Sequence, residues 1–457
     1  MSNSFVQVPP DGTGKKIYHT QHTVGSDIVQ VAGTILADAT NPSRGLKINE
    51  HGAASVRFTE GEPTFDTIGA LRVAQAFAIA TYDHVNQDLN DTFQTIVGTG
   101  GTYARNVNRS SMVLTTSTVA TASVSRTSHR YHYYQPGVGN LIIQTLNLSD
   151  AGKANNTRRW GYYDTTNGLY WELNNTTLSV NIRSYTTGAV TVNSIPRASW
   201  NGDLVDGFGI SGVTLDLTKG NFFWIDYAWL GVAPVRFGIE DPNGERIVCH
   251  TFQTPNSTFG PYMSTGTLPL QYENINTGVT AGTTDLSIIC AAVYAQTLVN
   301  YTFWRYADMS VTNKSVTIDT PVIAVRSKTT FNGKTNRVNA YPQTLSVYVT
   351  GGDIKLDLVQ NATSITGGTW TLPGESTVEG DVGGSAVVLG SLGWASSTHY
   401  LGVGSHNIDV GDLYEVNDDG ILLWPDATTQ PVWAIVATRL TGTATTVSAT
   451  LSYRELR

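Results

Sequence analysis

The chain has 457 residues, of which 14% are charged, and its formal net charge is -8 at pH 7. The length predicts about two to four domains, and the modest acidic charge gives no basic surface of the kind that nucleic-acid binding requires. With 45 glycines and few charged residues, the composition favours strands and tight turns, and it predicts an all-β protein.

Residues 1–65 are predicted to form an extended N-terminal anchoring arm with one or two hairpins. Turn signals such as Pro9-Pro10-Asp11-Gly12 separate short apolar runs such as Ile28-Val29-Gln30-Val31. We expect this arm to rely on the following domain or on a partner subunit, because it has too little apolar sequence for a core of its own. The stretch from Met1 to Lys16 lacks the apolar core of a secretory signal, which predicts synthesis in a cytoplasm.

Residues 66–312 are predicted to form a central antiparallel β-sandwich of jelly-roll-like type. Its first part, Leu71–Thr95, follows a helix face only weakly and is expected to be extended or a short helix. Aromatic and β-branched runs separated by turns then predict consecutive antiparallel strands; these runs are 160–163, 169–173 and 177–183. A second hairpin is predicted from Val235 to Phe252, around the turn Asp241-Pro242-Asn243-Gly244.

Residues 313–457 are predicted to form a second, β-sandwich-like C-terminal domain. The alternating runs Leu345–Val349 and Ile354–Leu358 flank Gly351-Gly352 and predict a half-exposed meander. The most apolar stretch of the chain, Phe222–Val235, is too short to cross a bilayer, so no membrane association is expected.

The densest cluster of polar and aromatic residues is Ser128–Tyr134. At the strand period of two, His129 and His132 fall on opposite faces, whereas a zinc site needs three or four convergent ligands. We therefore interpret the cluster as a strand with one packed aromatic face. His19 and His22 are too isolated to be assigned as ligands, and neither a metal nor a cofactor is expected.

Five carboxylates are candidates for a glycosidase pair: Asp164, Glu172, Asp203, Asp206 and Asp226. Turn and strand-face roles explain most of them more simply, because Asp164 begins a turn and Asp226 lies within an aromatic strand. No nucleophile elbow, phosphate-binding loop or zinc signature accompanies them. The chain is therefore predicted not to be an enzyme, with no catalytic residues.

Four tryptophans could form a platform that stacks on a sugar ring: Trp171, Trp200, Trp224 and Trp229. Their alternating context favours the core of the sandwich, and a carbohydrate-binding face is the alternative. Cys249 and Cys290 both have apolar neighbours, which predicts two buried small hydrophobic residues. The sequence leaves open whether these two cysteines are bonded.

Several segments resemble a family of virion structural proteins of tailed bacteriophages, many from aquatic hosts. The segments are Val8–Lys16, Tyr133–Gly137, Asp206-Gly207, Ser211–Asp216, Phe223–Val232, Val235–Gly238, Pro321–Arg326 and Phe331–Gly333. The resemblance implies an accessory head, neck or tail protein of the virion, fibre-like or decoration-like, whose partners are other virion proteins. A homo-oligomer is expected, with a trimer favoured by analogy. The alternative function is a receptor-binding protein that recognises host surface glycan through exposed aromatic residues of the C-terminal domain.

Overall fold

The computed structural model describes residues 3–7, 16–24, 27–32, 67, 76–296, 304–371, 375–411 and 430–456. The chain divides into two units, Met1–Glu62 and Pro63–Arg457. In the first unit, three strands form an antiparallel sheet in the order β1 (Asn3–Gln7), β2 (Lys16–Val24) and β3 (Asp27–Ala32). The hairpins predicted for the N-terminal arm are therefore present, and its anchoring role stays a prediction.

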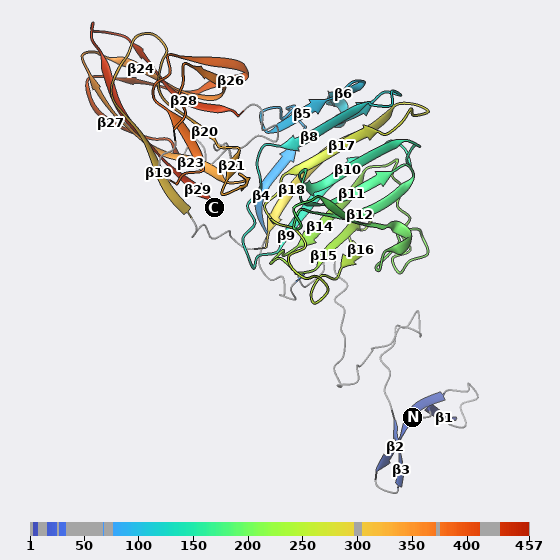
Figure 1. Ribbon diagram of the computed structural model, residues 1–457. Helices are drawn as coiled ribbons and strands as arrows, with labels where there is room; N and C mark the ends of the chain where they lie inside the picture. The colour runs from blue at the N-terminus through green and yellow to red at the C-terminus, as the bar shows by residue number, and fades with distance from the viewer. Residues whose placement is uncertain are drawn as a thin grey trace. The chain divides into compact units, whose positions relative to one another are not determined.

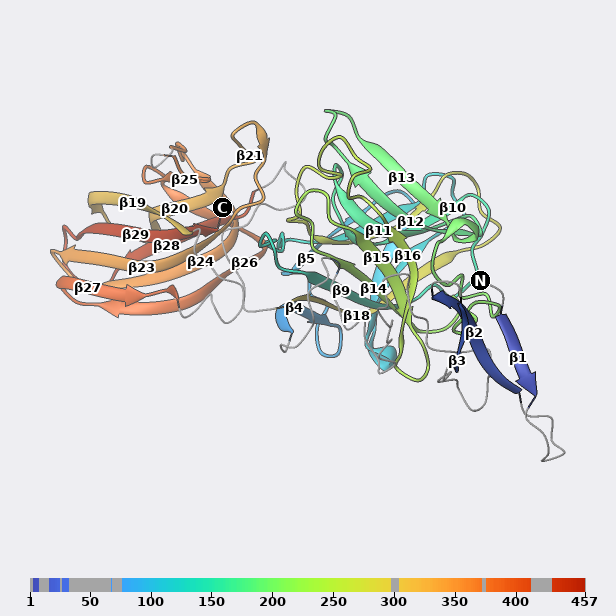
Figure 2. The same ribbon diagram turned by 90° about the horizontal axis from the view of Figure 1, so that it is seen from below.

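The central part of the second unit is a sandwich of two antiparallel sheets (Figures 1 and 2). The seven-stranded sheet has the order β13 (Thr191–Pro196), β12 (Thr177–Ser184), β11 (Gly168–Asn174), β10 (Asn156–Tyr163), β17 (Leu270–Asn276), β8 (Ser123–Ser128) and β5 (Phe93–Val97). The eight-stranded sheet has the order β16 (Arg246–Phe252), β15 (Val235–Glu240), β14 (Asn221–Tyr227), β9 (Asn140–Asn147), β18 (Thr284–Ala295), β7 (Ser111–Thr116) and β6 (Gly101–Asn106), with β4 (Phe77–Asp83) paired to β18. Two short 3-10 helices, Val107–Arg109 and Arg197–Ser199, lie between strands.

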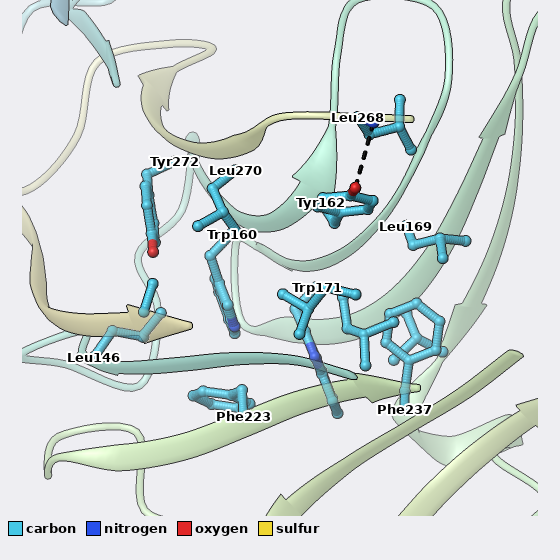
Figure 3. Close-up of a cluster of buried hydrophobic side chains, with 14 of the residues drawn as sticks. Leu146, Trp160, Tyr162, Leu169, Trp171, Phe223, Phe237, Leu268, Leu270 and Tyr272 are labelled. Carbon is cyan, nitrogen blue, oxygen red and sulfur yellow. Dashed lines mark hydrogen bonds between the residues drawn. The ribbon is translucent and has the colours of Figure 1, made fainter. Parts of the chain in front are cut away.

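Large aromatic rings fill the space between these two sheets (Figure 3). Trp160 of β10 and Trp171 of β11 are register partners, and their rings stack with centroids 6.4 Å apart. Phe223 of β14 packs against both tryptophans from the opposite sheet, at 4.9 Å and 5.2 Å. Each ring pair contributes about 0.5–1.5 kcal/mol beyond the burial of apolar area. The core therefore explains why the aromatic runs fold as strands.

The C-terminal part of the second unit is a second antiparallel sandwich. Its four-stranded sheet has the order β19 (Trp304–Ser315), β29 (Thr446–Leu456), β23 (Asn339–Thr350) and β27 (Gly404–Asp409). Its five-stranded sheet has the order β25 (Val378–Asp381), β20 (Thr320–Ser327), β28 (Val432–Arg439), β24 (Ile354–Thr366) and β26 (Ala386–Leu401). A two-stranded hairpin, β21 (Thr330–Phe331) with β22 (Lys334–Thr335), follows β20. The all-β fold class with two sandwiches is thus confirmed.

Three local predictions need correction or completion. The part of Leu71–Thr95 that the structure describes is extended, since it contains β4 and the start of β5; Leu71–Gln75 lie outside the described residues. The boundary predicted after residue 312 falls inside β19, which pairs with β29 and so belongs to the C-terminal sandwich. The predicted meander is wrong, because Gly351-Gly352 joins β23 in one sheet to β24 in the other.

Candidate functional site

The outer face of the seven-stranded sheet carries polar side chains at the positions between its core residues. On β10, Trp160 and Tyr162 point into the sandwich, so Arg159 and Tyr163 lie on the outer face. The register extends this face across the neighbouring strands β11, β12 and β17. We name the following residues the outer-face array: Arg159, Tyr163, Tyr170, Glu172, Arg183, Gln271 and Glu273.

Arg159 connects two glutamates across three strands of the array. Its Nε is 2.6 Å from Oε2 of Glu172 on β11, and its Nη1 is 3.0 Å from Oε2 of Glu273 on β17. The side chains are partly buried, with 26% of Arg159 and 14% of each glutamate exposed. Burial alone would lower the pKa of Arg159, but the negative charges of Glu273 and Glu172 outweigh it and raise the pKa above its ordinary value.

Two tyrosines and a second arginine form a layer beside this charged group. The rings of Tyr163 and Tyr170 lie 4.7 Å apart, and the Arg183 guanidinium lies over them at 5.2 Å and 5.0 Å. Burial, together with the charge of Glu273, raises the pKa of Tyr163 well above its ordinary value, so its hydroxyl stays protonated. Arg183 also donates from Nη1 to the backbone carbonyl of Asp164 over 2.6 Å.

The array holds its planar hydrogen-bonding groups in fixed positions before any ligand arrives. Gln271 donates from Nε2 to Oε1 of Glu273 over 2.9 Å, which orients the second oxygen of this carboxylate. Two carboxylates, two guanidinium groups and a carboxamide together offer both donors and acceptors. Many of these donors and acceptors are already bonded to one another within the array.

Of the five carboxylates considered from the sequence, Glu172 belongs to the array and the others do not join it. Asp164 begins the β10–β11 turn, as predicted, where its Oδ1 accepts from the backbone N–H of Thr166 and Asn167, and it also pairs with Arg337. Asp226 is fully buried on β14 and pairs with Arg236 over 2.5 Å. Asp203 and Asp206 organise a separate loop.

Of the array, only Glu172 was singled out as a candidate from the sequence; its partners Arg159 and Glu273 were not singled out. The strand of Glu273, β17, lies next to β10 only because the fold brings together segments more than a hundred residues apart. The local signal was limited to the alternation in Gln271-Tyr272-Glu273, which is shared by many half-exposed strands. Sequence reasoning alone therefore had no means of pairing Glu273 with Glu172.

The cluster Ser128–Tyr134 does not continue as a strand, so that prediction is wrong. The strand β8 ends at Ser128, and the chain then bends, with an isolated bridge between His132 and Leu268. The His132 ring lies 2.9 Å from the Tyr82 hydroxyl and 3.1 Å from the Leu268 carbonyl. Burial and the nearby Arg130 lower the pKa of His132 to about 3, so the ring is neutral.

No group of three or more His, Cys, Asp or Glu side chains converges as a metal site would within the part of the chain that the structure describes. His19 and His22 both lie on β2, and their backbone positions pair with Ala32 and Val29 of β3.

The tryptophans considered as a sugar platform are mostly buried. Trp171 and Trp200 belong to the core between the sheets, as predicted. Trp224 is also buried, but it alternates with the core residues Phe223 and Ile225 and so lies on the other face of β14, where its Nε1 donates to the Ile239 carbonyl over 3.0 Å. Trp229 is half-buried and packs its edge against Tyr134. These four rings therefore do not form an exposed platform.

The C-terminal sandwich also displays exposed aromatic rings. The outer face of its four-stranded sheet displays Tyr306 and Tyr348, which are 73% and 51% exposed. The outward positions around them are mainly hydroxyl side chains: Ser310, Thr344, Ser346, Thr350, Ser405, Thr446, Ser448, Thr450 and Ser452. Several of them contact each other across strands, for example Ser310 with Thr450 at 3.0 Å. We name this surface the hydroxyl face.

The two cysteines differ in exposure. Cys249 on β16 is buried, as predicted, whereas Cys290 on β18 is exposed, so the prediction that both are buried is wrong for Cys290. The reason is a bulge, because β18 shifts its register against β9 between Ile288 and Cys290. Both cysteines are free, which answers the question of a bridge between them.

None of the described helices has the length and hydropathy of a membrane span.

No protein-family model matches the chain, and no curated protein matches it. Among solved structures, a protein of unknown function from Shewanella oneidensis is 12% identical, with 50% of this chain and 91% of that chain covered and a TM-score of 0.33. A legume lectin-like domain from Entamoeba histolytica is 10% identical, with 48% and 99% covered and a TM-score of 0.31. A glycoside hydrolase family protein from Mycobacterium thermorestibile is 11% identical, with 48% and 99% covered and a TM-score of 0.30. At these identities and TM-scores, the similarities assign no function to this chain.

Proposed function

We propose that this protein is a non-enzymatic recognition and assembly component of a tailed-bacteriophage virion, and that the outer-face array binds a polyhydroxylated ligand, a glycan of the host surface. The observation that carries the glycan proposal is the Glu172, Arg159 and Glu273 group on three adjacent strands. The virion assignment rests on the sequence resemblance and on the N-terminal sheet, which forms a unit of its own.

Fixed geometry is what makes the array suitable for binding. A glycan presents hydroxyl groups that must exchange water for protein partners, and each flexible side chain ordered on binding costs about 0.5–1.5 kcal/mol. In the array, Arg159, Glu172 and Glu273 already order one another, so much of this cost is met during folding. Because few further side chains must be ordered when the ligand binds, more of the contact energy contributes to affinity.

The same geometry argues against hydrolysis of the glycan. A glycosidase needs one carboxylic acid that donates a proton and one carboxylate that acts as base or nucleophile. Both glutamates of the array already accept hydrogen bonds from Arg159, which holds them in place beside it. The proposal therefore assigns them to ligand contact and gives neither the role of a general acid.

A second candidate for the glycan contact is the hydroxyl face of the C-terminal sandwich. Tyr306 and Tyr348 are exposed there and offer ring faces to a sugar, which the buried rings of the outer-face array do not. This surface fits the alternative function drawn from the sequence, in which aromatic residues of the C-terminal domain contact host glycan.

The full-length protein can be tested against a panel of bacterial surface polysaccharides, with binding measured by titration calorimetry. We expect selective binding, and we expect Glu273→Gln to weaken it by roughly tenfold or more, because one charged acceptor is lost. Tyr348→Ala is the matched control and should bind as the wild type does. If Tyr348→Ala weakens binding and Glu273→Gln does not, the glycan contact lies on the hydroxyl face. If the wild type shows no selective binding, the proposal of glycan recognition is wrong.

The virion assignment has its own test. Antibodies raised against the purified protein should label intact phage particles, and a chain that begins after Glu62 should fold but no longer join them. If the truncated chain assembles normally, the anchoring role of the N-terminal unit is wrong. If the particles carry no such protein, the virion assignment is wrong whatever the glycan result.

A further inference from the structure

A loop between η2 (Arg197–Ser199) and β14 projects two large apolar side chains away from the central sandwich. Phe208 is 95% exposed and Ile210 is 90% exposed. The base of the loop is anchored, since Val205 is fully buried and Leu215 packs in the core. We name residues 206–214 the apolar tip. Its side chains therefore protrude from a firmly attached base.

The apolar tip is held in one conformation by Asp203. One carboxylate oxygen accepts from the backbone N–H of Val205 and the other from that of Ser211, both over 2.8 Å. Although burial alone would raise it, these bonds hold the pKa of Asp203 below its ordinary value. The Gly207 N–H also donates to the Val213 carbonyl over 3.0 Å. The exposure of Phe208 and Ile210 thus belongs to an ordered loop.

Exposed apolar side chains on an ordered loop are characteristic of an anchor for another molecule. Burying an exposed Phe or Ile side chain is favourable because apolar surface leaves water, and interface energy concentrates in a few such residues. Within the folded chain, neither Phe208 nor Ile210 is buried, so both side chains are available for contact with a partner.

The charges around the apolar tip narrow the choice of partner. The tip itself, residues 206–214, carries one charge, that of Asp206. At its base, Arg197 donates to the carbonyls of Leu204 and Val205, and Lys219 pairs with Asp216 over 3.5 Å. Elements that insert into membranes usually carry Lys and Arg for anionic headgroups. The tip has the opposite charge, so a protein partner with basic and apolar groups fits it better.

The same chain offers such a surface. Residues 328–337, which include the β21–β22 hairpin, contain Lys328, Lys334 and Arg337 and no acidic residue. Lys328 lies over the ring of Phe331 at 5.8 Å, and Lys334 is exposed. Arg337 is already paired with Asp164, so the positive charge that this basic hairpin offers comes from Lys328 and Lys334. Together with the ring of Phe331, these lysines complement the acidic surroundings of Phe208 and Ile210.

We propose that the apolar tip of one copy docks on the basic hairpin of a second copy. Because the two surfaces differ, the contact is heterologous, and repetition around a rotation axis closes it into a ring. The proposal does not depend on the glycan site, since none of the residues involved belongs to the outer-face array.

Analytical ultracentrifugation of the full-length protein across a concentration series tests the proposal. The wild type should self-associate, and Phe208→Ser/Ile210→Ser should weaken association by roughly a hundredfold, since each anchor contributes roughly tenfold. Val119→Ser/Val279→Ser removes two exposed valines elsewhere and should associate as the wild type does. Asp203→Asn keeps Phe208 and Ile210 but replaces one of the two carboxylate oxygens that accept from the loop backbone. It should weaken association less than Phe208→Ser/Ile210→Ser does.

A mixing experiment tests the heterologous geometry. The tip variant has an intact hairpin, and Lys328→Glu/Lys334→Glu has an intact tip, so neither should self-associate while an equimolar mixture should form heterodimers. A wild type that stays monomeric, a tip variant that associates normally, or a mixture without heterodimers would overturn the proposal. Tip-dependent binding to phosphatidylcholine and phosphatidylserine vesicles by a monomeric wild type would also overturn it, in favour of a membrane contact.

Discussion

Arg159 and Glu172 lie directly opposite each other on β10 and β11, with the guanidinium Nε 2.6 Å from a carboxylate oxygen. On the other side of β10, the same guanidinium reaches Glu273 of β17 at 3.0 Å. A single cation therefore lies between two carboxylates that would otherwise repel each other across the sheet. Loss of Arg159 would remove two cross-strand pairs and leave both partly buried carboxylates without this cation.

Replacement of Arg159 by methionine should destabilise the fold. We expect the free energy of unfolding to fall by about 1–3 kcal/mol, because the partly buried carboxylates of Glu172 and Glu273 lose their counterion. Methionine keeps the packing of the aliphatic part of the side chain, so the change reports mainly the loss of charge. Urea unfolding at neutral pH measures this change. The triple variant Arg159→Met/Glu172→Gln/Glu273→Gln should recover most of the loss. A single variant as stable as the wild type would show that the charged group adds nothing measurable.

Strand formation around this group could be predicted from the sequence, but the group itself could not. The turns at Asn167-Gly168 and Asn174-Asn175 lie between aromatic runs, and they join β10, β11 and β12 as expected. Alternation also shows that Arg159 and Trp160 face opposite ways. Which distant strand becomes the second neighbour of β10 depends on the packing of the whole sandwich, and no local pattern contains that information.

Acid should destabilise the central sandwich through buried neutral histidines. Burial, together with the charge of Arg126, lowers the pKa of His84 to about 4 and that of His129 to about 3; burial and Arg130 lower that of His132 to about 3. Below the unfolded value of about 6.5, the unfolded chain binds protons that the folded chain excludes, so stability falls as the pH falls. Each histidine can contribute at most about 1.4 kcal/mol per pH unit in this window.

Thermal melting between pH 7.5 and pH 5 checks this expectation and keeps most carboxylates ionised. The melting temperature should decrease towards pH 5, and His129→Gln should make the decrease shallower. Val279→Ser, which replaces an exposed side chain that carries no titratable group, is the control and should melt with the same pH dependence as the wild type. A melting temperature that stays constant over this range would contradict the assignment of neutral buried rings.

Gly168 should not tolerate a side chain. A Cβ atom at this position would lie 1.9 Å from the Cβ and 2.4 Å from the Cα of Tyr163, so the backbone of β10 would have to move. We expect Gly168→Ala to lower the free energy of unfolding by about 1–3 kcal/mol in urea. Gly220→Ala is the matched control, because its nearest neighbour would lie 3.9 Å away. Equal stability of the two variants would contradict this close approach.

Departures from regular strands were the features that sequence periodicity could not predict. The bend after Ser128 buries His129 and His132 together, although a strand would separate them. The apolar tip places Phe208 and Ile210 in solvent, and strand periodicity gives no indication of this exposure. In both cases side-chain bonds to the backbone, such as those of Asp203 to Val205 and Ser211, replace the regular ladder.

Thiol labelling should distinguish the two cysteines. Cys290 is exposed at the β18 bulge, whereas Cys249 is buried in the core, where burial strongly raises its thiol pKa. A thiol reagent should therefore modify one cysteine in the folded protein and both in urea. Burial and the charge of Asp83 also raise the pKa of Cys290, so its labelling should accelerate as the pH rises above neutral. Cys290→Ser should remove the reaction of the folded protein; rapid labelling that persists in this variant would mean that Cys249 is accessible and that the register of β16 against β15 is wrong.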